Sequence, residues 1–155
     1  MGLDMYFSAK KYMSKYFDKA DVERIEKIND IFGVTGIEDD DYGAQEVIFR
    51  VAYWRKANAI HKWFVDNVQN GTDDCGDYEV PNEKLKELLE LVDQVLANKK
   101  KAHKLLPNTT GFFFGSQDYD EYYFQDLEYT KKLIEGILSN EELSKHWYLE
   151  YTSSW

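Results

Sequence analysis

Two segments of the chain repeat apolar residues at helical spacing, and this pattern constrains the fold more than any other feature of the sequence. The first stripe consists of Leu85, Leu88, Leu89, Val92 and Leu96. The second consists of Tyr123, Leu127, Thr130, Ile134 and Ile137. Each stripe predicts an amphipathic helix with one face packed against the rest of the chain. We expect the first helix to begin at Asn82 after Pro81, and the second near Asp118, with Glu121 completing a capping box.

A third stripe predicts the central helix of the core. It consists of Tyr53, Ala57, Ile60, Phe64 and Val68, and it ends at Asn70-Gly71. A further helix is expected to begin near Asp18 and to end at Gly33. Residues 45–51 contain β-branched and aromatic side chains, so they fit either a short strand or the first turns of the central helix. We favour the strand.

The two ends of the chain carry the strand signals. Leu3–Phe7 resembles a short buried strand, and the lysine-containing stretch up to Lys15 is expected to continue irregularly. Trp147–Tyr151 is aromatic and predicts a C-terminal strand that pairs with the N-terminal one. The expected class is therefore α+β, with three to four amphipathic helices packed on a small sheet formed by the two terminal strands. With 155 residues, the sequence predicts a single globular domain over 1–155.

The charge of the chain limits its partners. The sequence has 29 acidic and 19 basic residues, a formal net charge of −10, which repels the phosphate backbone of nucleic acids. Two acidic runs, 38–41 and 73–77, fit either solubilising surface or a site that engages a basic protein. The sequence lacks an apolar stretch long enough to span a membrane. Because Cys75 is the single cysteine and the start shows no secretory pattern, we expect a cytoplasmic protein.

The predicted central helix carries the first group of candidate binding residues. Trp54 offers a ring for stacking, whereas Arg55 and Lys62 carry charges that neutralise an anion. Asn58 and His61 lie three residues apart, beside the apolar stripe, and each needs a polar partner there. That partner is either a bound ligand or a neighbouring loop of the protein itself.

The second group of candidate residues lies between Gly111 and Tyr123. Glycines on both sides of three phenylalanines allow close approach of the backbone, and the turn before the following helix can seat an anion. The alternative is a buried aromatic strand with no ligand. The residues that we expect to contact a ligand here are Phe113, Ser116, Tyr119, Asp120 and Tyr123.

Other chemistry has weaker support in the sequence. The three histidines are far apart, so we expect no metal site and no cofactor. A thiol at Cys75 is compatible with nucleophilic catalysis, but no family signature surrounds it. An enzyme that uses His61 with Asp120 or Asp74 as acid and base stays open as an alternative.

Four segments taken together resemble a family of small tailed-bacteriophage proteins with no established activity. These segments are GLDMY at 2–6, YWRKANAIHKWF at 53–64, DDCG at 73–76, and GFFFGS at 111–116 with YDEYY at 119–123. The serine-serine-tryptophan end at 153–155 also fits this family. The resemblance covers nearly the whole chain.

The resemblance implies a phage accessory protein that acts in the host cytoplasm against a defence system. Such a protein can sequester an anionic, ring-containing small molecule, such as a nucleotide-derived immune signal, which is our first hypothesis. It can instead inhibit a host defence protein by mimicking nucleic acid with its acidic loops, or act as an enzyme on a nucleotide-like molecule. A structural role in the virion is the remaining alternative. The high aromatic content, 16%, favours a homo-oligomer.

Overall fold

The computed structural model describes residues 2–37, 43–111 and 114–155. The chain packs as two compact units: Met1–Ala9 with Arg50–Trp155 form the first unit, and Lys10–Phe49 form the second unit. Two strands, β1 (Asp4–Tyr12) and β2 (Glu46–Arg55), contribute residues to both units. The expectation that 1–155 behaves as one domain stays a prediction.

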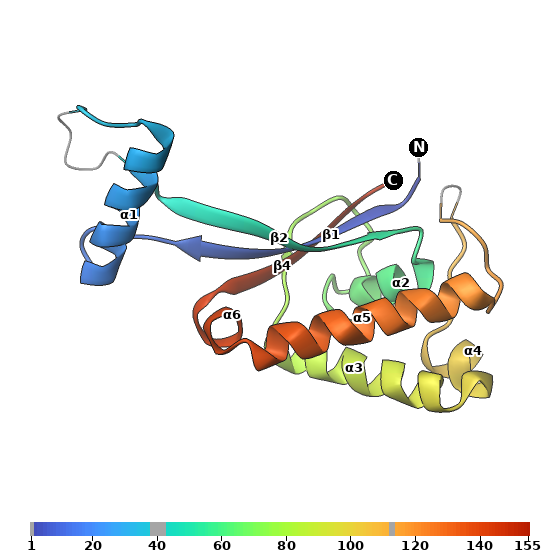
Figure 1. Cartoon of the computed structure of the whole chain (residues 1–155). Helices are drawn as coiled ribbons and strands as arrows, with labels where there is room; N and C mark the ends of the chain where they lie inside the picture. The colour runs from blue at the N-terminus through green and yellow to red at the C-terminus, as the bar shows by residue number, and fades with distance from the viewer. Residues whose placement is uncertain (1, 38–42, 112–113) are drawn as a thin grey trace. The chain divides into compact units, whose positions relative to one another are not determined.

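The strands form a four-stranded antiparallel sheet in the order β2-β1-β4-β3 (Figure 1). The short strand β3 (Tyr78–Glu79) pairs with β4 (Tyr148–Ser154), with Tyr78 opposite Tyr151. Because β1 lies beside β4, the predicted pairing of the two terminal strands is confirmed. The N-terminal strand is longer than predicted. It continues through its lysines to Tyr12, because a strand ladder depends on backbone hydrogen bonds and tolerates polar side chains.

Six α-helices accompany the sheet in the described part of the chain, so the predicted α+β class is confirmed. Their bounds are α1 Lys19–Phe32, α2 Asn58–Asn67, α3 Asn82–Ala97, α4 Ala102–Leu105, α5 Glu121–Ser139 and α6 Glu141–His146, with a 3₁₀ turn at Lys99–Lys101. Helix α1 begins after Asp18, whose carboxylate accepts from the Ala20 N–H, and ends at Gly33 with φ 68°. Both of its predicted boundaries are confirmed.

The stripes of the last two long helices form much of the core of the first unit. All five predicted stripe residues of α5 are buried, and α3 buries Leu85, Leu88 and Val92. The two helices pack side by side on one side of the sheet (Figure 1). Helix α3 begins at Asn82 after Pro81, as predicted, and no side chain at its N-cap position makes a capping hydrogen bond. The start of α5 is shifted from the predicted one, because its cap is Asp120, whose carboxylate accepts from the Tyr123 N–H.

The prediction of a helix from Tyr53 is wrong. Tyr53, Trp54 and Arg55 belong to β2, and the helix begins only at Asn58. In this part of the strand Ala52 and Trp54 are buried while Tyr53 and Arg55 are exposed, which is the alternation of a strand with one face on the core. The Trp54 indole donates to Thr130 Oγ1 at 2.9 Å inside the core.

The core of the first unit combines one face of the sheet with α2, α3 and α5. Met5 and Phe7 of β1 and the preceding Leu3 are buried in it, and Phe64 of α2 stacks on Tyr151 of β4 at 4.0 Å between ring centroids. This packing fixes α2 against the sheet. Within the described residues, no helix is both long enough and apolar enough to cross a membrane.

The second unit has a small and partly polar interior. Within its described residues, 10–37 and 43–49, the buried apolar side chains are Met13 and Ile25, and Asp21 and Asn29 are buried with them. Burial alone would raise the pKa of Asp21, but hydrogen bonds from the Arg24 guanidinium and the Ser14 N–H outweigh burial and lower it. Polar contacts therefore carry much of the packing in this unit.

Candidate functional site

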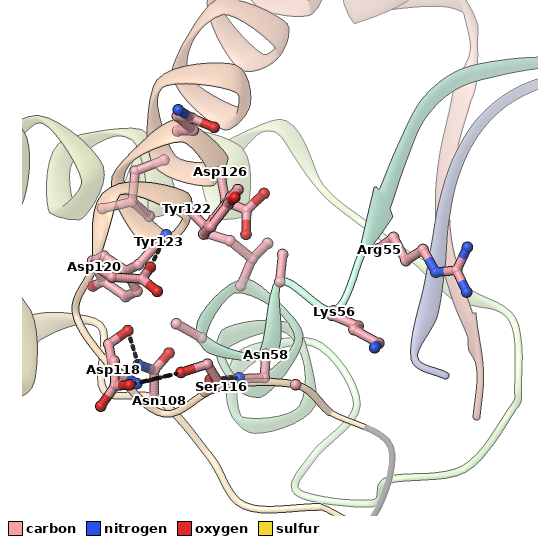
Figure 2. Close-up of a pocket in the computed structure, with 16 residues that line it drawn as sticks. Arg55, Lys56, Asn58, Asn108, Ser116, Asp118, Asp120, Tyr122, Tyr123 and Asp126 are labelled. Carbon is pink, nitrogen blue, oxygen red and sulfur yellow. Dashed lines mark hydrogen bonds between the residues drawn. The ribbon is translucent and has the colours of Figure 1, made fainter. Parts of the chain in front are cut away.

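A pocket of about 300 Å³ opens in the first unit between the start of α2 and the start of α5 (Figure 2). One side is formed by the end of β2 and the first turn of α2, including Arg55, Lys56 and Asn58. The opposite side is formed by the loop before α5 and by its first turns. The lining residues from that side include Asn108, Ser116, Asp118, Asp120, Tyr122, Tyr123 and Asp126.

The backbone at Lys56 is strained where β2 gives way to α2. Its φ is 61°, in the left-handed region that a residue with a β-carbon seldom adopts. The Lys56 N–H donates to Leu3 O at 2.8 Å, and the Lys56 carbonyl accepts from the Asn58 N–H at 2.8 Å. These bonds hold the turn and bring the Lys56 side chain to the rim of the pocket, against Gly115.

Asn58 holds the two sides of the pocket together. Its Nδ2 donates to Phe114 O at 3.1 Å and to Ser116 O at 2.8 Å, and its Oδ1 accepts from the Thr109 N–H at 3.0 Å. Only 3% of the residue is exposed. The sequence left open whether a ligand or a loop satisfies this amide. In the structure the loop satisfies it, so Asn58 lines the pocket as the residue that positions the loop.

The loop before α5 is held by short-range hydrogen bonds. Ser116 Oγ accepts from the Asp118 N–H at 3.0 Å, and Asn108 Nδ2 donates to Gln117 O at 2.9 Å. Tyr123 lies at the base of the pocket, where its hydroxyl donates to Leu106 O at 2.8 Å and burial raises its pKa. The wall on this side is therefore pre-organised.

Asp126 is the most perturbed carboxyl group of the pocket. Burial, and to a smaller extent the nearby negative charge of Asp120, raise its pKa to about 6. Among the residues that the structure describes, none donates a hydrogen bond to this carboxylate or pairs with it. In Figure 2 the Asp126 side chain faces the pocket from α5. A half-buried carboxylate without a partner favours an incoming hydrogen-bond donor or cation.

Arg55 and Lys56 supply positive charge at the other side. The Arg55 side chain is 63% exposed, and its Nε lies 4.0 Å from Asp4 Oδ1, an exposed pair that contributes little stability. Figure 2 shows both side chains on the β2 side, across the pocket from Asp118, Asp120 and Asp126, with the Arg55 guanidinium directed away from these carboxylates. The pocket therefore has a basic end and an acidic end.

The structure brings five of the ten predicted ligand-binding residues to this pocket. They are Arg55, Asn58, Ser116, Asp120 and Tyr123. Tyr119 does not line it, and its ring instead packs edge-on against Tyr123 at 5.0 Å between centroids. Phe113 lies outside the described residues.

Trp54 and Lys62 are not at the pocket, contrary to their expected roles. The Trp54 ring is buried in the core on the opposite side of the strand from Arg55, so it cannot stack on a ligand here. Lys62 pairs with Asp66 at 2.6 Å on the exposed side of α2. The error for Trp54 follows from extending the helix back to Tyr53, which placed a strand residue on a helical face.

His61 is fully buried and belongs to a separate polar network. Its Nδ1 lies 2.7 Å from the Tyr151 hydroxyl, and its Nε2 lies 3.1 Å from Asp73 Oδ1, which also accepts from the Trp155 indole at 3.1 Å. Because Asp73 can only accept, Nε2 carries the proton and Nδ1 accepts from Tyr151. Burial lowers the pKa of His61, and Asp73 offsets part of this effect. His61 therefore ties α2 to the C-terminal strand as a neutral side chain.

The remaining candidates have local roles. Asp74 accepts from the Gly76 N–H at 2.9 Å and from the Tyr78 hydroxyl, which stabilises the acidic 73–77 loop. Cys75 is exposed on that loop as a free thiol. The acidic run at 38–41 lies outside the described residues. In 2–37, 43–111 and 114–155, no three His, Cys, Asp or Glu side chains gather closely enough to hold a metal ion.

Sequence analysis missed Lys56, Asp118, Tyr122 and Asp126 as pocket residues. Asp126 had a usable signal, because it follows Tyr123 by three residues and Asp120 by six, which places a carboxylate next to the buried stripe of the helix. Lys56 had none, since its position depends on where the strand ends. Tyr122 stands at the rim with 75% of its surface exposed and offers a ring face to a ligand.

Comparisons of the chain with protein-family models, with curated proteins and with solved structures gave no match. The resemblance to small phage proteins therefore stays a prediction. The shape and charge of the pocket are the basis for a functional proposal.

We predict that the Asn58 amide is required for the loop to stay in place. Asn58→Ala leaves one N–H and two carbonyl groups without their partner, and it should lower the free energy of unfolding by about 2–4 kcal/mol. Asn58→Asp should cost at least as much, because a carboxylate would face the carbonyls of Phe114 and Ser116. Urea unfolding measures both effects. Asn67→Ala is the control, because it removes a single hydrogen bond, from Asn67 Nδ2 to the Trp63 carbonyl of the same helix. It should lower the free energy of unfolding by less than about 1 kcal/mol.

A second prediction concerns the pH dependence of stability. Because the pKa of His61 is lower in the folded protein than its model value of 6.5, the unfolded chain takes up its proton first as the pH falls. His61 should therefore contribute stability above pH 6.5 that is lost as the pH decreases. Urea unfolding between pH 7.5 and 5 measures this loss. The free energy of unfolding should fall less steeply with decreasing pH in His61→Gln than in the unmodified protein. The exposed His146→Gln is the control, and equal slopes in all three proteins would contradict the prediction.

Proposed function

We propose that this pocket binds a small ring-containing molecule that carries an anionic group at one end and hydrogen-bond donors at the other, as nucleotide derivatives do. The observation that carries the proposal is the half-buried Asp126 carboxylate, which faces the pocket and has no partner among the described residues. Folding gains nothing from an unpaired carboxylate in that position. A ligand that donates to it would supply the missing partner.

The acidic side of the pocket defines what one end of the ligand must offer. Asp118, Asp120 and Asp126 gather there, so a bare anion would be repelled. Exocyclic amines of a base and hydroxyl groups of a ribose are donors that carboxylates accept. This side of the pocket therefore fits the base or sugar of a nucleotide better than its phosphate.

The basic side fits the anionic group. Among the described residues, the exposed Arg55 guanidinium has one ionic contact, at 4.0 Å with Asp4, and Lys56 follows it in the turn. A guanidinium can donate two parallel hydrogen bonds to a phosphate, and such charge-assisted bonds are among the stronger ones in proteins. Tyr122 at the rim provides a face for the ring.

The size of the pocket is consistent with this ligand class. A volume of about 300 Å³ lies at the lower end of the range typical of small-molecule sites. The resemblance to phage proteins supports a sequestering role, in which the protein withholds a nucleotide-derived signal from a host defence system. Binding without turnover is sufficient for that role.

The first test is native mass spectrometry of the protein purified gently from bacterial cells, followed by titration with AMP, GMP and ATP. We expect a retained mass of a few hundred daltons or saturable binding of a nucleotide. Arg55→Gln should weaken binding at least tenfold, roughly, which corresponds to one lost charge-assisted bond. Lys86→Gln, a neutralisation on exposed α3 surface, is the matched control. If Arg55→Gln and Lys86→Gln bind equally well, the proposed basic end is wrong.

Asp126→Asn should separate binding from stability. Because the folded-state pKa of Asp126 is raised to about 6 from 3.8, the stability associated with its protonated form is lost as the pH rises through 6. The Asp126→Asn variant, whose side chain is a neutral amide, should therefore unfold at a higher temperature than the unmodified protein at pH 7.5. It should also bind the nucleotide more weakly. Glu128→Gln, the same change at an exposed position of α5, should alter neither. Calorimetry of unfolding and of binding measures the two effects.

Lys56→Gly makes a similar separation at the basic end. Glycine adopts a φ of 61° without strain, so the variant should be as stable as the unmodified protein or more stable by up to about 1 kcal/mol. Loss of the ammonium group should nevertheless weaken nucleotide binding. Asn70→Gly relieves the same kind of strain, at φ 54°, at a position that does not line the pocket, and it should leave binding unchanged.

A further inference from the structure

Two amide side chains line the acidic side of the pocket, and the nitrogen of each is engaged within the protein. Asn108 Nδ2 donates to Gln117 O at 2.9 Å and to Asp118 O at 3.3 Å. Gln125 Nε2 donates to Glu121 Oε1 at 3.1 Å. Since these partners can only accept, each amide must turn its nitrogen toward them. In the described part of the chain nothing donates to the two amide oxygens, so each remains available as an acceptor.

The hydroxyl groups on this side of the pocket are also engaged as donors. Ser116 Oγ donates to Asp118 Oδ2 at 3.2 Å, and the Tyr123 hydroxyl donates to Leu106 O at 2.8 Å. The exception among the described lining residues is Tyr122 at the rim, whose hydroxyl has no partner there. Inside the rim, the described side chains on this side therefore offer acceptors to a ligand and no donor.

The Asp126 carboxylate is the acceptor that is best placed to recognise a ligand. It is half-buried, faces the pocket from α5 in Figure 2, and has no donor among the residues that the structure describes. By comparison, Asp118 Oδ2 already accepts from Ser116, and Asp120 Oδ1 accepts from the Tyr123 N–H. An ionised carboxylate accepts at two oxygens that lie in one plane, so it complements two N–H groups that point the same way. The ligand edge that fits Asp126 therefore has two adjacent donors.

Among the common nucleic-acid bases, guanine has such an edge. Its ring N1–H and its exocyclic N2 amine are adjacent donors. Adenine and cytosine each place an amine beside a ring nitrogen that accepts, and uracil places one N–H between two carbonyl oxygens. An acceptor on the ligand would face the negative oxygens of Asp126 and leave both groups without a hydrogen bond at a partly buried position. Guanine therefore satisfies the carboxylate, whereas the other bases leave part of it unpaired.

We propose that the pocket is selective for guanine nucleotides and that Asp126 is the residue that recognises the base. This inference rests on the proposed function, since it takes a nucleotide as the ligand. Guanine donates from N1 and N2 to the two Asp126 oxygens, its ring lies against the exposed face of Tyr122, and its phosphate is on the side of Lys56. Because Asp126 contacts the ligand directly, its replacement should change which base is preferred as well as the affinity.

Isothermal titration calorimetry of the full chain at pH 7.5 with GMP, IMP and AMP tests the selectivity. IMP differs from GMP by the absence of the N2 amine, so it should bind at least tenfold more weakly, roughly, because one hydrogen bond to a charged group is lost. AMP presents an acceptor to Asp126 and should bind at least a hundredfold more weakly, roughly. Equal affinities for the three nucleotides would leave the proposed function standing and overturn the guanine selectivity. If none of the three binds, the proposed function fails and this inference fails with it.

Asp126→Asn should reverse the base preference, a result that a purely structural role of Asp126 cannot produce. An amide has one acceptor and one donor, and xanthine presents the matching N1–H and C2 carbonyl where guanine presents two donors. The variant should therefore bind XMP at least tenfold more tightly than GMP, roughly, whereas the unmodified protein should prefer GMP. Glu128→Gln, the same change of charge at an exposed position of α5, is the matched control and should keep the preference for GMP. An Asp126→Asn variant that still prefers GMP overturns the inference.

Discussion

The pocket depends on the amide of Asn58 more than on any other group. Its three hydrogen bonds connect the first turn of α2 to three backbone positions of the segment 109–116. Among the described residues of that segment, 109–111 and 114–116, Phe114 is the buried apolar side chain, and the Asn58 amide fixes the distance between the two sides of the pocket. Since α2 is itself anchored in the core by Phe64, the rigidity of the sheet extends through Asn58 to the loop that carries Ser116.

Periodicity predicted the elements whose burial follows a single face. The stripe of α5 is buried at all five predicted positions, and the two terminal strands pair as expected. The boundary between β2 and α2 was mistaken because Tyr53 and Ala57 fit a helical stripe by spacing alone. What ends the strand is the left-handed backbone at Lys56, and a lysine gives no sequence signal for that conformation.

The sequence located the two sides of the candidate site but could not distinguish their chemistry. Asn58 and His61 have the same signature, a polar side chain beside an apolar stripe. One is satisfied by a loop that borders the pocket, and the other by Tyr151 and Asp73 in a separate network. Which long-range partner a buried polar group finds depends on the tertiary fold. Helical spacing does not contain that information.

Two features at the pocket oppose folding rather than assist it. Lys56 occupies a conformation that glycine would adopt without strain, and Asp126 is a partly buried carboxylate with no partner in the described structure. Either could arise as an isolated imperfection. Here they lie on opposite sides of one pocket, one with a basic and the other with an acidic side chain. Local costs that converge on one concave site are expected where a site is built for a ligand, because binding can repay what folding loses. Under the proposed function, the ligand carries its negative group toward Lys56 and its hydrogen-bond donors toward Asp126.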